Sequence, residues 1–135
     1  IPSEALIKYY MDRKEITEDN FYDLSYWSKQ GVLLLNASLT VRQGVPLSHM
    51  HLWIPFTSYV INLLSNKKDR LIFMLWGKFA QRLETQIDQS KHTILTCGHP
   101  VTVVYGNDTW TGNDHFIQAN HLLCKWNGIY SDILW

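Results

Sequence analysis

The sequence has little of what usually ties a protein to a membrane, a disulfide framework or a highly charged partner. Only two of its 135 residues are cysteine and four are proline, and 12 basic residues balance 12 acidic ones, so the formal net charge is zero. No apolar run reaches the roughly 18 residues that a membrane-spanning helix needs. A neutral balance also produces no overall basic field. Any contact with nucleic acid must therefore come from a local patch.

Motifs for nucleotide and metal binding are absent or weak. Neither G-x-G-x-x-G nor G-x-x-x-x-G-K-[ST] occurs, so a nucleotide cofactor has no support. His49 and His51 form an H-x-H pair that would need Cys97 or His99 to complete a metal site, and no acidic cluster accompanies them. Cys97 lies in an apolar run, where a reduced, buried thiol is the expected state. We therefore predict no cofactor and no metal.

The chain contains enough apolar residues to build one globular domain. Hydrophobic residues make up 46% of it and charged residues 18%, a balance that excludes a disordered chain. We interpret residues 1–135 as a single domain and expect a monomer that does not associate with a membrane. Because nothing resembles a secretory signal peptide, we expect an intracellular protein, cytoplasmic or, in a eukaryote, nuclear.

Short apolar runs predict three strands of a sheet, at residues 31–35, 71–76 and 93–97. Continuous runs of this length are typical of parallel strands that are covered on both faces. The spacing of the other apolar residues predicts helices over 51–65, 79–87 and 116–126. Ser3 is suited to cap a helix at the start of the chain. This alternation indicates an α/β fold, a three-layer sandwich whose short parallel sheet is flanked by helices.

Each predicted strand runs directly into a polar residue. Asn36 follows the first run, Lys78 follows the second after one glycine, and His99 follows the third after another. Ligands bind at the carboxyl ends of the strands in such sheets, so we expect these three residues to line one crevice. The residues alone leave other roles open. Asn36 is equally suited to cap a strand end, His99 to a structural role, and Lys78 to a solvated surface.

The stretches around these strand ends resemble family 1 uracil-DNA glycosylases. GVLLLNASLTV at 31–41 is similar to the family's uracil-recognition segment, and FMLWGKFAQ at 73–81 to its third strand and the following helix. KHTILTCGHP at 91–100 resembles the strand that carries the family's active-site histidine. Residues that match the helices of the family are Ser48-His49, Trp53, Phe56-Thr57, Val60-Ile61, His115-Phe116 and Ala119-Asn120. The similarity is collinear and covers nearly the whole chain.

The resemblance implies a hydrolase that cleaves the N-glycosidic bond of uracil in single- or double-stranded DNA and so starts base excision repair. His99 would be the catalytic residue that stabilises the departing uracil anion. Asn36 would bind the substrate, since its carbonyl can accept from uracil N3–H while its amide donates to O4, a pattern that cytosine reverses. The DNA-binding residues implied are Ser3, Gly77, Lys78, Val101, Val103, Val104 and Tyr105. Val103 and Val104 stand where the family places an apolar wedge.

The sequence departs from the family in two places. The family's water-activating motif, G-Q-D-P-Y-H, has no counterpart, and its H-P-S-P-L-S loop is replaced by HPVTVV at 99–104. We therefore expect the chain to be the carboxyl-terminal portion of the enzyme, without the catalytic Asp. The family's missing strand lies inside the sheet, so we also expect the strand that ends at Asn36 to be exposed. The alternative function is a catalytically impaired DNA-binding or interaction module with the same fold.

Overall fold

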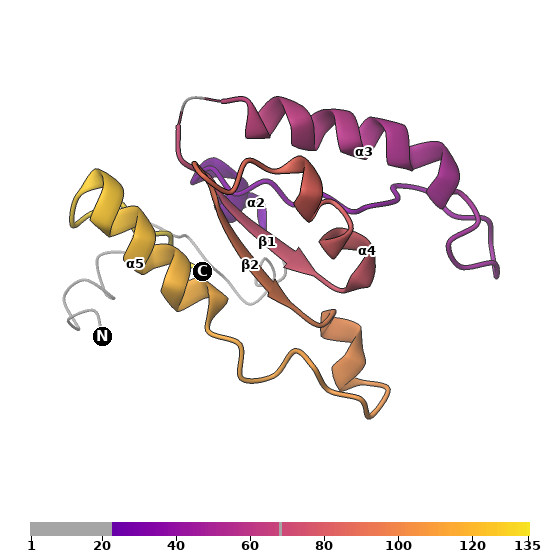
Figure 1. The fold of residues 1–135 in the computed structure, drawn as a ribbon. Helices are drawn as coiled ribbons and strands as arrows, with labels where there is room; N and C mark the ends of the chain where they lie inside the picture. Colours follow the sequence, from indigo (N-terminus) through magenta and orange to yellow (C-terminus); the bar gives the residue numbers. More distant parts are fainter. Residues whose placement is uncertain (1–22, 68) are drawn as a thin grey trace. The chain divides into compact units, whose positions relative to one another are not determined.

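In the computed structural model, shown in Figure 1, residues 23–67 and 69–135 are described and short helices alternate with two strands. The elements in chain order are α2 (Ser25–Lys29), α3 (Met50–Ser65), β1 (Ile72–Trp76), α4 (Lys78–Gln81), the 3-10 helix η2 (Glu84–Gln86), β2 (Thr93–Cys97), the 3-10 helix η3 (Pro100–Val103) and α5 (His115–Asn127). This order confirms the predicted α/β class. The helix cap predicted at Ser3 lies outside the described residues.

The described residues form two compact parts, one made of 23–35 with 120–135 and the other of 36–119. In the first part, side-chain amides hold the backbone near the end of the chain. Gln30 accepts from Leu134 N at 2.9 Å and donates to Leu134 O at 3.1 Å. Asn120 makes the same pair of bonds with Ile133, at 2.9 and 2.8 Å. Each amide satisfies both polar groups of one residue, which fixes residues 133–134 in one register.

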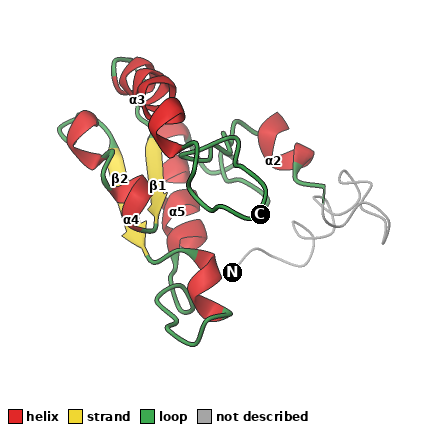
Figure 2. Ribbon diagram, turned by 90° about the vertical axis from the view of Figure 1, so that its right-hand side faces the viewer, coloured by secondary structure: helices red, strands yellow, loops and turns green. Residues whose placement is uncertain are grey.

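The second part is built around a parallel pair of strands. β1 and β2 are hydrogen-bonded from Ile72 opposite Thr93 to Trp76 opposite Cys97, so that the two strands end level with each other. They lie between α3 and the beginning of α5, and Figure 2 shows the same pair from the side. Phe73 and Leu75 of β1 are buried. The strands predicted at 71–76 and 93–97 are thereby confirmed.

The strand predicted over 31–35 is wrong, because no strand is formed there in the structure. Leu33 and Leu34 are 60% and 52% exposed. A strand is defined by its hydrogen bonds to a neighbour, and the sheet found among residues 23–67 and 69–135 contains only β1 and β2. The segment before Asn36 is exposed, as expected, but it is not a strand.

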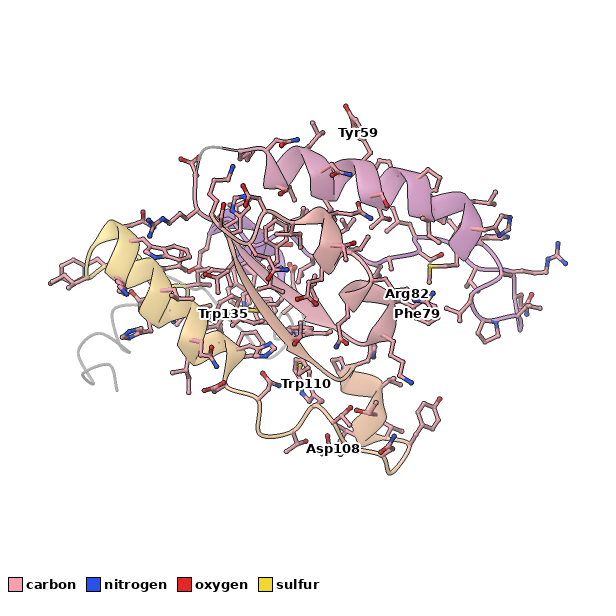
Figure 3. The ribbon with its side chains drawn as sticks, in the orientation of Figure 1. Tyr59, Phe79, Arg82, Asp108, Trp110 and Trp135 are labelled. Carbon is pink, nitrogen blue, oxygen red and sulfur yellow. The ribbon has the colours of Figure 1, made fainter. Side chains whose placement is uncertain are left out.

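Helix α3 confirms the helix predicted over 51–65, and it buries Ile61, one of the apolar residues whose spacing predicted it. Its buried residues are Thr57, Ile61 and Ser65, each one turn after the last. Phe56, which the apolar spacing placed inside, is 46% exposed. Tyr59 projects outward from the helix (Figure 3). The buried residues lie on the side of α3 that faces η2 and the beginnings of the strands. Two of the three, Thr57 and Ser65, carry hydroxyl groups.

The helix predicted over 79–87 is divided into α4 and η2. Gln86 of η2 donates to Ser58 Oγ and accepts from Asn62 Nδ2, both at 3.2 Å. These bonds fix η2 on α3, so η2 does not continue the axis of α4.

At the end of α4, the Arg82 guanidinium lies 5.0 Å from the centre of the Phe79 ring (Figure 3).

His92 joins the starts of both strands to the end of α3. Its ring is 4% exposed. Leu71 N donates to its Nδ1 at 3.1 Å, which places the ring proton on Nε2, and Nε2 donates to Ser65 O at 2.8 Å. Ser65 Oγ in turn accepts from Asp88 N at 2.8 Å. One buried ring therefore satisfies two backbone groups that belong to different elements.

We predict that His92→Leu lowers the free energy of unfolding by about 2 to 4 kcal/mol, because it leaves a buried N–H and a buried carbonyl without partners. Urea denaturation of the chain measures this loss. The control is His51→Leu, which removes an exposed histidine and should change stability by less than about 0.5 kcal/mol. Equal effects of the two substitutions would contradict the role assigned to His92.

Candidate functional site

The two level strand ends bring Gly77 and His99 into contact. Gly77 N donates to Cys97 O at 2.9 Å, which extends the ladder by one residue. Gly77 has φ 88° and ψ 163°, a region that only glycine adopts readily. A Cβ placed on Gly77 would lie 2.9 Å from the Cβ of His99. The absence of a side chain at Gly77 therefore sets how closely the backbone of β1 approaches His99.

The His99 ring is oriented by the backbone that follows it. Val101 N donates to His99 Nδ1 at 3.1 Å. Because a backbone N–H can only donate, Nδ1 carries no proton and the ring N–H is on Nε2. The carbonyl of His99 accepts from Thr102 N and Thr102 Oγ1, at 2.9 and 2.7 Å, where η3 begins. His99 thus presents one N–H donor from an exposed position at the carboxyl end of the sheet.

Gly98 allows the loop after η3 to return against the end of β2. Gly98 N donates to Thr109 O at 3.0 Å. A Cβ on Gly98 would lie 1.7 Å from Thr109 Oγ1, so no other residue fits without displacing the loop. Thr109 N also donates to Thr102 Oγ1 at 3.2 Å. The loop is therefore closed on the same residues that orient His99.

Asp108 shapes the tip of this returning loop. Its Oδ1 accepts from Trp110 N at 2.9 Å and from Thr111 N at 2.8 Å. Hydrogen bonds from the Thr111 side chain and backbone, and then from the Trp110 backbone, hold the pKa of Asp108 below its usual value. Trp110 packs edge to face on Trp76, with ring centres 4.4 Å apart. Asp108 and Trp110 lie close together in Figure 3.

The residues proposed to contact DNA differ in how the structure places them. Lys78 is exposed at the start of α4. Val101 and Val103 are 43% and 46% exposed, and Val104 and Tyr105 are each 79% exposed, so these four form an apolar tip directly after His99. We call Val101, Val103, Val104 and Tyr105 the apolar tip. Trp110, further along the same loop, is packed on Trp76.

Asn36 is exposed at the beginning of a segment that α3 holds in place. Thr57 Oγ1 donates to Ala37 O at 3.2 Å. Further along, Trp53 Nε1 donates to Thr40 Oγ1 at 2.7 Å, and the same hydroxyl lies 3.0 Å from His49 Nδ1. No hydrogen bond joins Asn36 to His99 within residues 23–67 and 69–135. A single crevice lined by Asn36, Lys78 and His99 therefore stays a prediction.

Within the part of the chain that the structure describes, no three His, Cys, Asp or Glu side chains are grouped as metal ligands. His49 Nδ1 is instead directed at Thr40. Cys97 and Cys124 are free, and burial raises the pKa of the Cys97 thiol. None of the described helices is long and apolar enough to cross a membrane.

Sequence reasoning assigned no role to several residues that shape the site. Gly98 and Asp108 fix the loop, and His92 and His115 are buried at opposite ends of the strands. A signal for Gly98 exists in the sequence, since it separates a strand from the H-P dipeptide. The two histidines carry no such signal, because burial of an imidazole depends on partners that are distant in sequence.

Comparison with known proteins assigns the family. The model of the uracil DNA glycosylase superfamily matches residues 6–124. The chain belongs to this superfamily. It is 50% identical over 105 residues to a uracil-DNA glycosylase of Amoebophilus asiaticus, covering 76% of the chain and 47% of that protein. It is 44% identical over 127 residues to one of Dichelobacter nodosus, covering 90% of the chain and 55% of that protein.

Solved structures of the uracil DNA glycosylase superfamily share the fold. Mimivirus uracil-DNA glycosylase aligns with a TM-score of 0.68 and 29% identity, over 82% of this chain and 46% of that one. This similarity confirms the predicted uracil-DNA glycosylase-like fold. The chain spans about half the length of the curated relatives it matches.

We predict that Gly77→Ala displaces His99 and destabilises this superfamily member by about 2 to 4 kcal/mol, from backbone strain together with overpacking. The matched control is Gly106→Ala, because Gly106 also has a positive φ, of 73°, but nothing lies within 4 Å of its added Cβ. Gly106→Ala should lower the free energy of unfolding only by the cost of backbone strain, about 1 to 2 kcal/mol. Urea denaturation of both variants gives the difference, and equal losses would show that the contact with His99 is unimportant.

Proposed function

We propose that this chain carries the uracil-binding and leaving-group-stabilising part of a uracil-DNA glycosylase. The observation that carries the proposal is the arrangement of His99, whose Nδ1 is occupied by Val101 N while its Nε2–H is available at an exposed strand end beside Gly77. Membership of the superfamily supports it, as do curated relatives named uracil-DNA glycosylase. The substrate class is uracil-containing DNA, single- or double-stranded.

The reaction needs a hydrogen-bond donor at uracil O2, and His99 can present one. When the bond between C1′ of the sugar and N1 of uracil breaks, its electron pair moves onto the base and negative charge develops at O2. The Nε2–H of His99 donates to O2, and this hydrogen bond strengthens as the charge grows. Water then adds to C1′ and loses its proton to a base, a step that we assign to no residue of this chain.

Asn36 is proposed to select uracil. Its side-chain carbonyl accepts from N3–H and its amide donates to O4. Cytosine presents an acceptor and a donor in the reverse order, so a fixed Asn36 would face two unsatisfied contacts. Once the bound base covers Asn36, a mismatch of this kind separates substrates by orders of magnitude. The bonds from Thr57 and Trp53 of α3 to the segment that follows Asn36 support a fixed orientation of Asn36.

The DNA-binding role is proposed for Gly77, Lys78 and the apolar tip. Lys78 supplies a positive charge next to the strand end for a phosphate. The exposed side chains of Val103, Val104 and Tyr105 suit insertion into the base stack that the flipped uracil leaves. A DNA contact of Ser3 is proposed from the sequence alone, because Ser3 lies outside the described residues. We propose a monomeric, single-domain arrangement, working inside the cell without a metal or cofactor.

We predict that His99→Leu lowers the rate of uracil release by roughly 10²- to 10³-fold, because one preorganised donor is lost at the departing base. DNA affinity should change much less. Single-turnover release and equilibrium binding to a uracil-containing oligonucleotide measure the two effects. Lys78→Ala is the converse control, expected to weaken binding and flatten its salt dependence by about one unit of slope or less while the saturated rate is kept.

The assay is made with the chain alone and with a chimaera in which the chain replaces the matching segment of the Dichelobacter nodosus relative. Release by either protein, lost in His99→Leu, supports the enzyme function. If binding and release fall together, or release persists at the original rate, His99 is structural. DNA binding without release, in a chimaera whose parent is active, would favour the alternative of a catalytically impaired DNA-binding module.

We predict that Asn36→Asp relaxes or reverses the preference for uracil over cytosine, because the substitution changes the donor and acceptor pattern in the pocket. Release from matched oligonucleotides that differ only in the target base measures the preference. Asn66→Asp, at an exposed amide directly after α3, is the control and should leave the preference unchanged. An unaltered preference in Asn36→Asp would remove Asn36 from base recognition.

A further inference from the structure

A buried histidine beside the strand ends has no part in the proposed chemistry. His115 begins α5 and is 5% exposed. Trp76 Nε1 donates to its Nδ1 at 3.0 Å, and the two rings are within 28° of parallel. Phe116 packs edge to face on the same Trp76, at 5.8 Å between ring centres. The end of β1 is thereby attached to the start of α5.

The partners of His115 determine its protonation. An indole N–H only donates, so Nδ1 is without a proton, and the uncharged ring carries its proton on Nε2. Burial lowers the pKa of His115, while the nearby Asp114 charge and the bond to Thr96 act in the opposite direction. Cys97 Sγ lies 3.9 Å from Nδ1, and burial keeps this thiol protonated. The remaining neighbours, Trp76 and Phe116, carry no charge.

These contacts lie directly before the glycine that ends each strand. Trp76 precedes Gly77, and Cys97 precedes Gly98 and His99. A shift of Trp76 relative to Cys97 therefore changes the approach of Gly77 to His99, where an added Cβ would be only 2.9 Å away. His115 contacts both strands at this level, through the Trp76 indole and the Cys97 thiol.

We propose that His115 is a positioning residue of the uracil site, whose uncharged ring links Trp76 to Cys97 and so holds His99 against Gly77. The inference rests on the proposed function only in calling the place a uracil site; the geometric claim stands without it. Protonation of His115 would put a second N–H on Nδ1, facing the indole N–H, and both cannot donate to each other. The link is therefore broken when His115 becomes charged.

The pH dependence follows from the lowered pKa of His115. The unfolded chain binds this proton at a higher pH than the folded chain does. The stability that the uncharged ring contributes is therefore complete above the ordinary histidine pKa, about 6.5. It is lost as the pH falls below that pKa. The link should survive somewhat below this pKa, because His115 of the folded protein takes up its proton at a lower pH.

The experiment follows the imidazole nitrogens by ¹⁵N NMR in the full chain, without DNA. In the wild type, His115 should carry its proton on Nε2 and titrate below a pH of about 6.5. His115→Leu should shift the His99 ring signals and the amides of Gly77 and Val101. His115→Gln can still accept from the Trp76 indole, so it should restore these signals in part. A wild-type His115 with its proton on Nδ1 would overturn the proposal.

The control is His92→Leu, which removes the buried histidine at the opposite ends of the same strands. It should lower stability without moving the His99, Gly77 or Val101 signals. If His115→Leu leaves those signals in place, or if His92→Leu moves them equally, His115 is only structural. Should His115→Leu fail to fold, the wild-type titration and His115→Gln decide the question.

Uracil release separates this inference from the proposed function. In a protein that releases uracil, His115→Leu should slow the step by roughly 10- to 100-fold, as expected for a displaced catalytic group, and His115→Gln should recover part of the rate. If the wild type releases no uracil but the His99 signals still respond to His115, the proposed function fails and the positioning role stands. If release is slowed while the His99 signals are unchanged, the positioning role fails.

Discussion

The level ends of two parallel strands are the constraint on which the rest of the structure depends. The register from Ile72 opposite Thr93 to Trp76 opposite Cys97 places Gly77 beside His99. A buried histidine lies at each end of this pair: His92 accepts from the Leu71 backbone at the starts, and His115 accepts from the Trp76 indole at the finishes. A slip of one residue would separate Gly77 from His99 and would turn every strand side chain to the other face. The chemistry proposed for His99 thus depends on the ladder rather than on His99 alone.

The buried interior of the described residues is small and unusually polar. Its apolar members are Ile61, Phe73, Leu75, Ile87 and Ala119, and its polar members are Thr57, Ser65, His92 and His115. Each of these polar side chains is bonded to backbone or to an indole N–H. Because an unsatisfied buried polar group is costly, such bonds specify one arrangement more strictly than apolar contact does. Many large apolar side chains, Leu33 and Tyr59 among them, remain exposed in a chain that spans about half of its relatives.

The elements that sequence reasoning predicted correctly are those whose signal is local. The strands at 71–76 and 93–97 and the helices near 51–65 and 116–126 are all found, with no boundary shifted by more than one residue. The run at 31–35 has the same apolar character but forms no strand, because a strand requires a hydrogen-bonded neighbour and residue type alone does not supply one. The run at 79–87 divides because Gln86 bonds to α3, a contact that no helical periodicity anticipates.

By itself the sequence determined the α/β class, the family resemblance, and the candidate residues Asn36, Gly77, Lys78 and His99, since each follows a recognisable apolar run. Only the tertiary structure decided which ring nitrogen of His99 is free, because that depends on Val101 N turning back onto Nδ1. It also decided that Gly77 must lack a side chain and that His115 contacts Trp76, 39 positions away. The physical reason is the range of the forces: apolar periodicity is written in neighbouring residues, whereas hydrogen-bond direction and close approach are set by residues that the fold brings together.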